Sequence, residues 1–438
     1  MAPLIPTPHG SKIITNTKIN QISTILSSSI PQLEPYDSLY RTFHANPELS
    51  GCEVETAARI ALHLRQFSNP AFTIHETIGG HGIIAILENG AGETVLLRAD
   101  MDALPIKERT NLPYASTVPS VAHACGHDMH ITTLLASASA LHASAPNWHG
   151  TLLLLFQPAE EDGTGAQSVC ADPTYGHILR TFPPSVLLGA HVVPAPFGLV
   201  AVRKGAMTSN SDSLHITIFG RGGHASMPES TIDPVVLAAY IIIRLQSIVS
   251  REVAPRQHAV ITVGSLQAGQ AENVIPSSAI LKINIRTFNS EVRKQVLKAV
   301  RRVVDAECSA SGCEKAAVIK ETLSLPMVWN DGGATDMLST TFEGIFGSRG
   351  GFVGDINPLP GSEDFGHLVT GAERPGVFWV YGCMDPALFE TSNTGPGEAF
   401  VPKMPIPSNH SAEFAPEIEG TLRTAVETYV AAALTWLL

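Results

Sequence analysis

The sequence lacks long apolar runs and a regular cysteine pattern, and both absences limit where the protein is expected to work. No uninterrupted run of about 18 apolar residues occurs in the 438 residues, so we expect no membrane-spanning helix. The N-terminal segment lacks a basic stretch followed by an apolar one, so no signal peptide is expected. The six cysteines are scattered without a disulfide framework, which fits a reducing compartment. We therefore expect a cytoplasmic protein.

Positive charge is scarce as well. The chain carries 28 Lys and Arg residues against 40 Asp and Glu residues, a formal net charge of −12. No cluster of Lys and Arg appears, so nucleic acid and anionic membranes are not expected as partners. The hydrophobic content of 44% is ordinary for a globular protein, and the length predicts about two or three domains.

The order of expected strands and helices divides the chain into two domains. Before Met207, short apolar runs typical of strands alternate with helices, which predicts an α/β fold with a largely parallel sheet. Between residues 207 and 325 the expected order is strand, helix, strand, strand, helix, strand, as in a ferredoxin-like unit. We therefore predict a discontinuous α/β domain over residues 1–206 and 326–438, with an inserted domain over 207–325. The expected elements of the inserted domain are Leu214–Phe219, Asp233–Ser250, His258–Leu266, Ala279–Thr287, Ser290–Cys308 and Lys315–Leu323.

Two motifs in the first half of the chain carry the chemistry. His123-Ala-Cys-Gly-His-Asp128 precedes an expected helix over Ile131–His142, and an irregular turn there would point the Cys and the second His into one pocket. The apolar run Thr151–Phe156 is followed by adjacent carboxylates, Glu160 and Glu161. A buried strand that brings two carboxylates to its carboxyl end places them where open α/β sheets hold active sites. Either motif alone favours a core thiol or a solvated acidic turn, but the two together favour a site.

Five side chains are candidate metal ligands: Cys125, His127, Glu161, His191 at the end of an apolar run, and His410 in a Pro-rich loop. Five donors exceed the needs of one tetrahedral ion and suit two ions that share a ligand. A thiolate with imidazoles favours zinc first, with manganese, cobalt and nickel as alternatives. Spacing alone is weaker evidence, because 17 histidines produce chance clusters and an isolated His410 is typical of a solvated loop.

Seven motifs in one order give the pattern a family. Together they resemble the two-metal amidohydrolases of peptidase family M-twenty, subfamily D, which contains hippurate hydrolases, N-acyl-amino-acid hydrolases and plant indoleacetyl-amino-acid hydrolases. The resemblance runs from about Arg41 to the C-terminus. It implies a metal-bearing α/β domain and an inserted lid that usually also forms a homodimer interface. The motifs are Arg98-Ala-Asp-Met-Asp-Ala-Leu-Pro105, His123-Ala-Cys-Gly-His-Asp128, Gln157-Pro-Ala-Glu-Glu161, Gly189-Ala-His191, Gly222-Gly-His-Ala225, Glu272-Asn-Val-Ile-Pro276 and Ser362-Glu-Asp-Phe365.

The resemblance implies a role for each candidate ligand. Cys125 would bridge two metals, His127 and His191 would complete one site, and Glu161 and His410 would complete the other. The remaining carboxylate, Glu160, would be the general base that takes a proton from the activated water and passes it to the leaving amine.

Three aspartates lie in two of the seven motifs. The resemblance implies that Asp102 orients a ligand histidine. Asp100 occupies the place of a ligand histidine in other branches of the family, and we expect Cys125 to compensate. Asp128 is expected either to support the ligands from outside or to cap the following helix.

In the inserted domain the resemblance implies substrate-binding residues. His224 matches a histidine that reaches a neighbouring subunit's active site and hydrogen-bonds the oxyanion. Asn273 and Arg286 match positions that bind the substrate's free carboxylate, a task that suits a planar guanidinium. Taken alone, His224 would be a turn residue and Arg286 a surface residue. Two departures from relatives, Glu229 after Met-Pro and Ala412 after His-Ser, leave the substrate's identity open.

The sequence therefore predicts a metal-dependent hydrolase of small N-acyl or N-aroyl amino acids. Three alternatives stay open: a dipeptidase or carboxypeptidase, an amide-forming biosynthetic enzyme, and a catalytically inactive binding protein. A complete ligand set together with Glu160 argues against the last of these.

Overall fold

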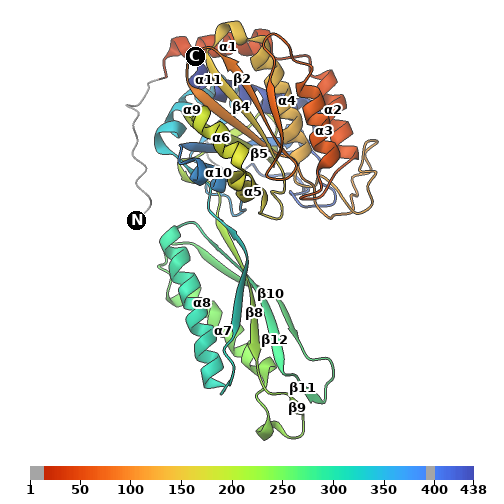
Figure 1. Cartoon of the computed structure of the whole chain (residues 1–438), viewed down its shortest axis with the longest axis vertical. Helices are drawn as coiled ribbons and strands as arrows, with labels where there is room; N and C mark the ends of the chain where they lie inside the picture. Colours follow the sequence, from red (N-terminus) through yellow and green to blue (C-terminus); the bar gives the residue numbers. More distant parts are fainter. Residues whose placement is uncertain (1–13, 391–399) are drawn as a thin grey trace. The chain divides into compact units, whose positions relative to one another are not determined.

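The computed structural model describes residues 14–390 and 400–438, which form two compact units (Figure 1). The larger unit contains the described residues up to Met207, then Trp329–Asn357, and then those from Asp364 onward. The smaller unit contains Thr208–Val328 and Pro358–Glu363. The chain thus leaves the larger unit after Met207 and returns to it in two later segments.

A mixed eight-stranded sheet forms the centre of the larger unit, in the order β1-β2-β4-β3-β5-β16-β6-β15. Pairing is parallel between β3 and β4, β3 and β5, β5 and β16, and β6 and β15. The expected α/β fold with a large central sheet is confirmed. The strands are β1 (Thr73–Ile78), β2 (Gly82–Asn89), β3 (Thr94–Asp100), β4 (Gly150–Gln157), β5 (Val186–Pro196), β6 (Val200–Val202), β15 (Phe352–Gly354) and β16 (Gly376–Met384), beside the short pair β7 (Gly205–Ala206) and β14 (Trp329–Asn330).

Strand β4 shows why the apolar runs predict buried strands. All of its residues are buried. Leu152 and Leu154 belong to the main hydrophobic core, whereas the equally buried Leu153 and Leu155 point to the other face of the sheet. Because both faces are covered, the strand has no polar alternation.

Helices cover the sheet. Two long and largely buried helices, α4 and α11, pack on each other and on β3. Helix α5 contacts β4, and α10 contacts both α5 and β5. Helix α4 is buried around most of its surface, as expected of a helix surrounded by protein. The helices of the larger unit are α1 (Asn16–Ser29), α2 (Glu34–Ala45), α3 (Val54–Leu64), α4 (His127–Ala143), α5 (Gly165–Ala171), α6 (Pro173–Thr181), α9 (Gly332–Phe346), α10 (Phe365–Ala372) and α11 (Ile418–Leu437).

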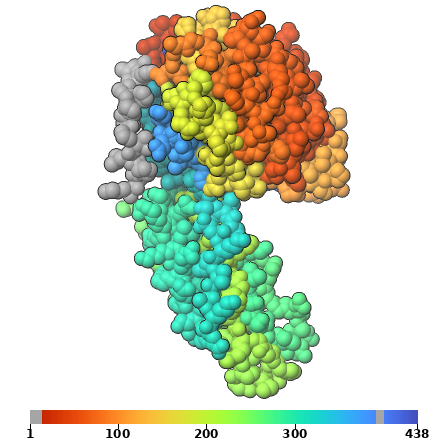
Figure 2. Space-filling view, viewed as in Figure 1, coloured from red at the N-terminus to blue at the C-terminus, as the bar shows by residue number. Residues whose placement is uncertain are grey.

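The smaller unit is a four-stranded antiparallel sheet, in the order β10-β12-β8-β13, with two helices packed against it. In β8 and β12, buried apolar residues alternate with more exposed and mostly polar ones, as expected of a sheet with one covered face. A short ladder, β9 with β11, lies at one end of this unit (Figure 1). The green and teal surface of this unit is seen in Figure 2. The elements are β8 (Asn210–Phe219), β9 (Gly223–His224), α7 (Pro234–Arg251), β10 (Ala259–Ala268), β11 (Val274–Ile275), β12 (Ser278–Thr287), α8 (Ser290–Ala310) and β13 (Val318–Leu325).

Helix α7 is long and apolar enough to cross a membrane by length and composition alone. A single helix of this kind is weak evidence for a membrane span, because helices of soluble proteins pass the same test. Here α7 packs on α8, β10 and β12, and it carries Arg244 in its middle. The absence of a membrane span stays a prediction.

Candidate metal centre

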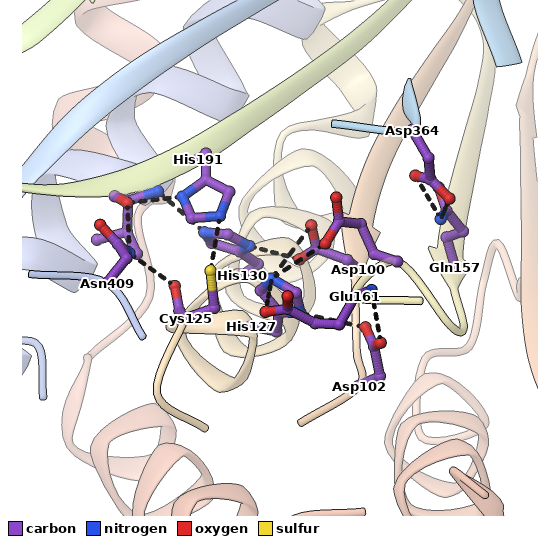
Figure 3. A network of polar contacts seen from close by, with 12 residues as sticks. Asp100, Asp102, Cys125, His127, His130, Gln157, Glu161, His191, Asp364 and Asn409 are labelled. Atoms are coloured by element: carbon purple, nitrogen blue, oxygen red, sulfur yellow. Dashed lines mark hydrogen bonds and ion pairs between the residues drawn. The ribbon is translucent and has the colours of Figure 1, made fainter. Parts of the chain in front are cut away.

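The candidate ligands come from the start of α4 and the turn before it, the turn after β4, the interior of β5 and the loop that holds His410. Figure 3 shows Cys125, His127, Glu161 and His191 together with the aspartates beside them. Asp100 is the last residue of β3, and Asp102 lies just beyond it. Glu160 and Glu161 lie in the turn after β4. Because neighbouring parallel strands end at the same edge of a sheet, these side chains meet although they are far apart in the sequence.

Cys125 lies at the centre of the predicted ligands. With His127 and His191 it forms one group of three donors whose ligand atoms all lie within 4.8 Å of one another. With Glu161 and His410 it forms a second such group. Cys125 is buried, and its Sγ lies 3.4 Å from His191 Nε2. The structure therefore brings together all five predicted ligands, with the thiol common to both groups.

His127 begins α4, directly after the turn that holds Cys125. Gly126 takes a left-handed conformation (φ 88°), and an added Cβ there would lie 2.5 Å from Val192, so glycine is required. The Nδ1 of His127 lies 3.2 Å from Asp102 Oδ1, so its N–H donates a hydrogen bond to that carboxylate. The Nε2 atom is buried without a hydrogen-bond partner. A carboxylate behind the imidazole and an unpartnered nitrogen in front is the usual arrangement of a metal-binding histidine.

His191 lies inside β5, because the strand continues through five more residues to Pro196. The expectation that it ends the strand is wrong, since Val192 and Val193 continue the ladder with β16. Its Nδ1 donates to the carbonyl of Val192 at 2.6 Å, so Nε2 is left facing Cys125. The adjacent backbone thus selects the imidazole nitrogen that faces the candidate metal site.

His410 comes from a loop but is held in a specific conformation. Its backbone is left-handed (φ 68°), a strained state for a residue with a side chain. Its backbone N–H donates to the carbonyl of Ala124 at 2.7 Å, and the neighbouring Asn409 amide donates to the carbonyl of Cys125. The His410 Nε2 atom lies 3.4 Å from Glu161 Oε2. These contacts tie the loop to the segment that carries Cys125.

Glu160 and Glu161 leave β4 through a tight turn. Glu161 Oε1 is buried without a hydrogen-bond partner, as is His127 Nε2, 3.8 Å away. Glu160 Oε2 lies 3.9 Å from the same nitrogen. Buried polar atoms without partners are costly unless something else satisfies them. A cation bound among the donors would satisfy both atoms, so the donor set fits divalent metal ions.

The electrostatics of the pocket favour a cation too. Burial raises the pKa of the Cys125 thiol, but His191 and His127 lower it to about 7. Hydrogen bonds with Cys125 and Glu161 raise the pKa of His410 to about 10. Burial opposes the shift of His191, yet Cys125 raises its pKa to about 9. The anionic donors keep the neighbouring imidazoles protonated when no metal is bound. A bound metal replaces these protons, because a histidine ligand must be neutral.

A second layer behind the ligands includes residues that sequence reasoning missed. His130 Nδ1 contacts Asp100, and its Nε2 accepts the backbone N–H of Val192 at 2.9 Å. Its spacing of three residues from His127 places both on one helix face, which is the signal that could have found it. Burial raises the pKa of Asp100, but the Arg98 guanidinium holds this pKa well below its ordinary value. Arg98 also donates to Asp364, from a segment 266 residues later.

Asp128 does not cap α4, so the capping alternative is wrong. The residue lies within the first turn, and Gly126 occupies the cap position. Its carboxylate instead accepts a hydrogen bond from the buried His44, whose Nδ1 is 2.6 Å from Asp128 Oδ2. The other ring nitrogen of His44 lies 3.2 Å from Glu108. Asp128 therefore joins α2 to α4 beside the ligands.

The predicted substrate-binding residues of the smaller unit do not form one cluster. His224 is exposed on β9, and its Nδ1 accepts hydrogen bonds from the backbone N–H and the hydroxyl of Ser226. The carbonyl of Asn273 accepts the N–H of Ala225, so Asn273 lies beside His224. Arg286 lies near the far end of β12, where it donates to Asn284 and to the carbonyl of Pro360.

Comparisons with known proteins agree with this geometry. Residues 96–403 match the family described as Peptidase family M20/M25/M40. A hippurate hydrolase from Campylobacter jejuni is 38% identical over 335 residues, which are 76% of this chain and 84% of that protein. An N-acetylcysteine deacetylase from Bacillus subtilis is 37% identical over 347 residues, which are 78% of this chain and 87% of that protein.

A solved structure matches over nearly the whole length. It is a dinuclear metal-binding peptidase of the M20 family from Bacillus subtilis, with a TM-score of 0.71 and 29% identity. The match covers 94% of this chain and 98% of that one. The chain therefore belongs to peptidase family M20/M25/M40, and it is an amidohydrolase of that family.

Proposed function

We propose that this protein is a two-metal enzyme that cleaves the amide bond of N-acyl or N-aroyl amino acids. The observation that carries the proposal is that Cys125 belongs to both groups of three donors. One thiolate shared by two donor groups suits a pair of divalent ions with a bridging ligand. The substrate class is supported by relatives named hippurate hydrolase and N-acetylcysteine deacetylase.

The two donor groups suggest the ligands of each ion. His127 and His191 would complete one site, and Glu161 and His410 the other, each with Cys125. Thiolate and imidazole donors favour zinc, and manganese, cobalt and nickel stay as alternatives. When bound, the ions would supply Lewis acidity and would lower the pKa of water in the site.

Glu160 is the proposed general base. Glu161 shares a donor group with Cys125 and His410, whereas Glu160 does not. Glu160 lies in two other donor groups, but neither of them contains Cys125. We therefore assign the metal to Glu161 and the proton to Glu160. It would take the proton from the attacking water and deliver it to the nitrogen of the leaving amino acid. Asp102 would hold the His127 ring through Nδ1 during this step.

Exchanging each glutamate of the pair tests this assignment. Glu160→Gln should bind metal normally but lose about 10²- to 10⁴-fold in kcat, because the amide cannot accept a proton. Glu161→Gln should lose metal instead. Elemental analysis and kinetics on both variants would show the assignment to be reversed if the two phenotypes are exchanged.

A substrate panel tests the reaction class. Metal-reconstituted enzyme should hydrolyse N-benzoyl or N-acetyl amino acids more efficiently than dipeptides. Preferred hydrolysis of dipeptides would favour a dipeptidase or carboxypeptidase, and net amide formation from the free acid and amine would favour a biosynthetic enzyme. A protein that binds these compounds without turnover would be a non-catalytic binding protein.

We also propose that the smaller unit is a ferredoxin-like lid that forms a homodimer. The order of its elements, β8-α7-β10-β12-α8-β13, and its strand order, β10-β12-β8-β13, support the ferredoxin-like assignment. Outer strand β10 has only one neighbour in the described sheet, and its side chains Val260 and Leu266 are exposed. An edge strand with exposed apolar residues suits pairing with a second copy.

A further inference from the structure

A turn outside the ligand set holds the backbone of the two catalytic-site glutamates. Glu53 lies at the start of α3, and its side chain has no exposed surface. Its Oε1 accepts hydrogen bonds from the backbone N–H of Ala159, at 2.8 Å, and of Gly51, at 3.0 Å. Burying a carboxylate is costly unless its hydrogen bonds compensate. Glu53 is therefore placed at a cost that local helix capping does not explain, since 106 residues separate it from Ala159.

Ala159 needs such support. It has a positive φ of 52°, which is strained for any residue with a side chain, and it directly precedes Glu160. Its carbonyl accepts the N–H of Gly165 at 2.9 Å, and the Glu160 carbonyl accepts the N–H of Gly163 at 2.8 Å. The direction in which Glu160 leaves the strand thus depends on a turn that must be held in a strained conformation.

A second carboxylate holds the other side of Glu160. Asp102 Oδ2 accepts the backbone N–H of Glu161 at 2.9 Å. The same oxygen accepts the hydroxyl of Ser50 at 2.6 Å. The N–H groups before and after Glu160 are therefore each bound by a buried carboxylate, and the single turn Ser50–Glu53 supports both of them.

We propose that Glu53 is a positioning residue, whose hydrogen bond to the Ala159 N–H fixes the turn that directs Glu160 and Glu161 into the site. The inference rests on the proposed function for the roles of those two glutamates. Glu53 acts through the Ala159 backbone. What the turn requires is an acceptor oxygen at Oε1, and a negative charge is dispensable. Burial raises the pKa of the Glu53 carboxyl, which agrees with a role that a neutral acceptor can fill.

Two neutral variants of similar size distinguish the effect of the hydrogen-bond acceptor from the effect of side-chain volume. Glu53→Gln keeps an oxygen that can accept the Ala159 N–H, whereas Glu53→Met does not. In metal-loaded enzyme, Glu53→Met should lower kcat by about 10- to 100-fold with little change in KM, the usual cost of losing support behind an active-site group. Glu53→Gln should keep most of the wild-type kcat, because its side-chain oxygen still accepts the hydrogen bond. Glu55→Gln and Glu55→Met, on the exposed side of the same helix turn, are the matched controls and should behave like wild type.

Hydrogen exchange gives a readout that does not depend on activity. Amides of residues 157–165 should exchange faster in Glu53→Met than in wild type, and at the wild-type rate in Glu53→Gln. Equal kcat and equal exchange in the two variants would overturn the proposal. If wild type hydrolyses no N-acyl amino acid, the proposed function fails, but the exchange comparison still decides the role of Glu53. If neither Glu53→Met nor Glu53→Ala folds, Glu53 is a folding determinant and the positioning proposal is overturned.

Discussion

At the scale of single residues, the proposed two-metal centre depends on the Cys125 sulfur, which is common to the two donor groups assigned to the ions. Cys125→Ala removes a donor from each group, so it should reduce metal content from about two ions per chain and should reduce activity together with it. Elemental analysis of the purified variant measures the first effect, and kinetics measure the second.

The control for this variant is Cys313→Ala, which removes a partly buried thiol from the smaller unit. It should keep metal and activity. A Cys125→Ala protein with full metal and full turnover would show that the thiol does not bridge two ions.

The buried His44 predicts how stability depends on pH. Burial lowers its pKa, but hydrogen bonds with Asp128 and Glu108 raise it to about 9. A raised pKa in the folded state means that the protonated histidine stabilises the fold fully below about pH 6.5 and loses this contribution as pH rises through 9. Burial raises the pKa of Glu108, but the hydrogen bond with His44 and other contacts lower it to about 2. Its contribution to stability is therefore lost as pH falls from about 4.5 through 2, outside the interval in which His44 titrates.

Denaturant unfolding at pH 6.5 and 9.5 measures this effect. Between these two pH values the free energy of unfolding of wild type should fall by at most about 3 kcal/mol more than that of His44→Gln. The variant lacks the imidazole that would lose its proton in this interval. Equal pH dependence in both proteins would show that His44 is not the titrating group.

At the scale of elements, apolar patterning predicted most strands and helices to within a few residues. The run Thr151–Phe156 became β4, and the segment Ala279–Thr287 became β12. Patterning did worse where tertiary contacts set the boundary. Helix α4 begins four residues before the expected Ile131, because left-handed Gly126 permits an earlier start. Strand β5 continues past His191, because β16 extends the ladder.

The residues that sequence reasoning missed act through contacts distant along the chain. Glu53 binds the Ala159 backbone across 106 residues, and Arg98 binds Asp364 across 266 residues. No local pattern indicates such a partner. The candidate ligands could be predicted because they are Cys, His and Glu residues in short motifs, and because those motifs resemble a known family. The contacts of Glu53 and Arg98 could be assigned only from the structure, because their partners lie in distant segments of the chain.

The turn after β4 gives a prediction at this scale. An added Cβ at Gly165 would lie 1.7 Å from the Pro158 carbonyl oxygen, a backbone atom that cannot move without shifting Glu160. Gly165→Ala should therefore destabilise the protein by about 1 to 3 kcal/mol and should reduce kcat. Thermal unfolding and steady-state kinetics measure both effects.

Gly332→Ala is the matched control, because both glycines begin helices and a Cβ at Gly332 meets nothing within 4 Å. The control should be neutral or more stable by up to about 1 kcal/mol. If the two variants behave alike, the close approach at Gly165 does not constrain the turn.

At the scale of the whole molecule, one chain cannot place its three proposed substrate-binding residues around one small substrate. His224 lies beside Val274 on the short β9–β11 ladder, just before β12 begins at Ser278. Arg286 lies eight residues along that regular strand, a separation of about 27 Å at the usual rise of 3.4 Å per residue. This span exceeds the reach of an arginine side chain. A shared substrate site therefore requires His224 and Asn273 from one subunit and Arg286 from another.

We therefore expect the lid to act in trans, with His224 completing the active site of its dimer partner. His224→Ala should lose about 10²- to 10³-fold in kcat, the usual cost of removing one oxyanion donor, and Glu160→Gln should be inactive too. In a twofold dimer with one copy of each variant, one site receives both substitutions and the other receives neither. Random mixing makes about half of the dimers mixed, so roughly a quarter of wild-type activity should return. Co-expression with two affinity tags isolates the mixed dimer, and a verified mixed dimer without activity would show that His224 serves its own subunit or has no catalytic part.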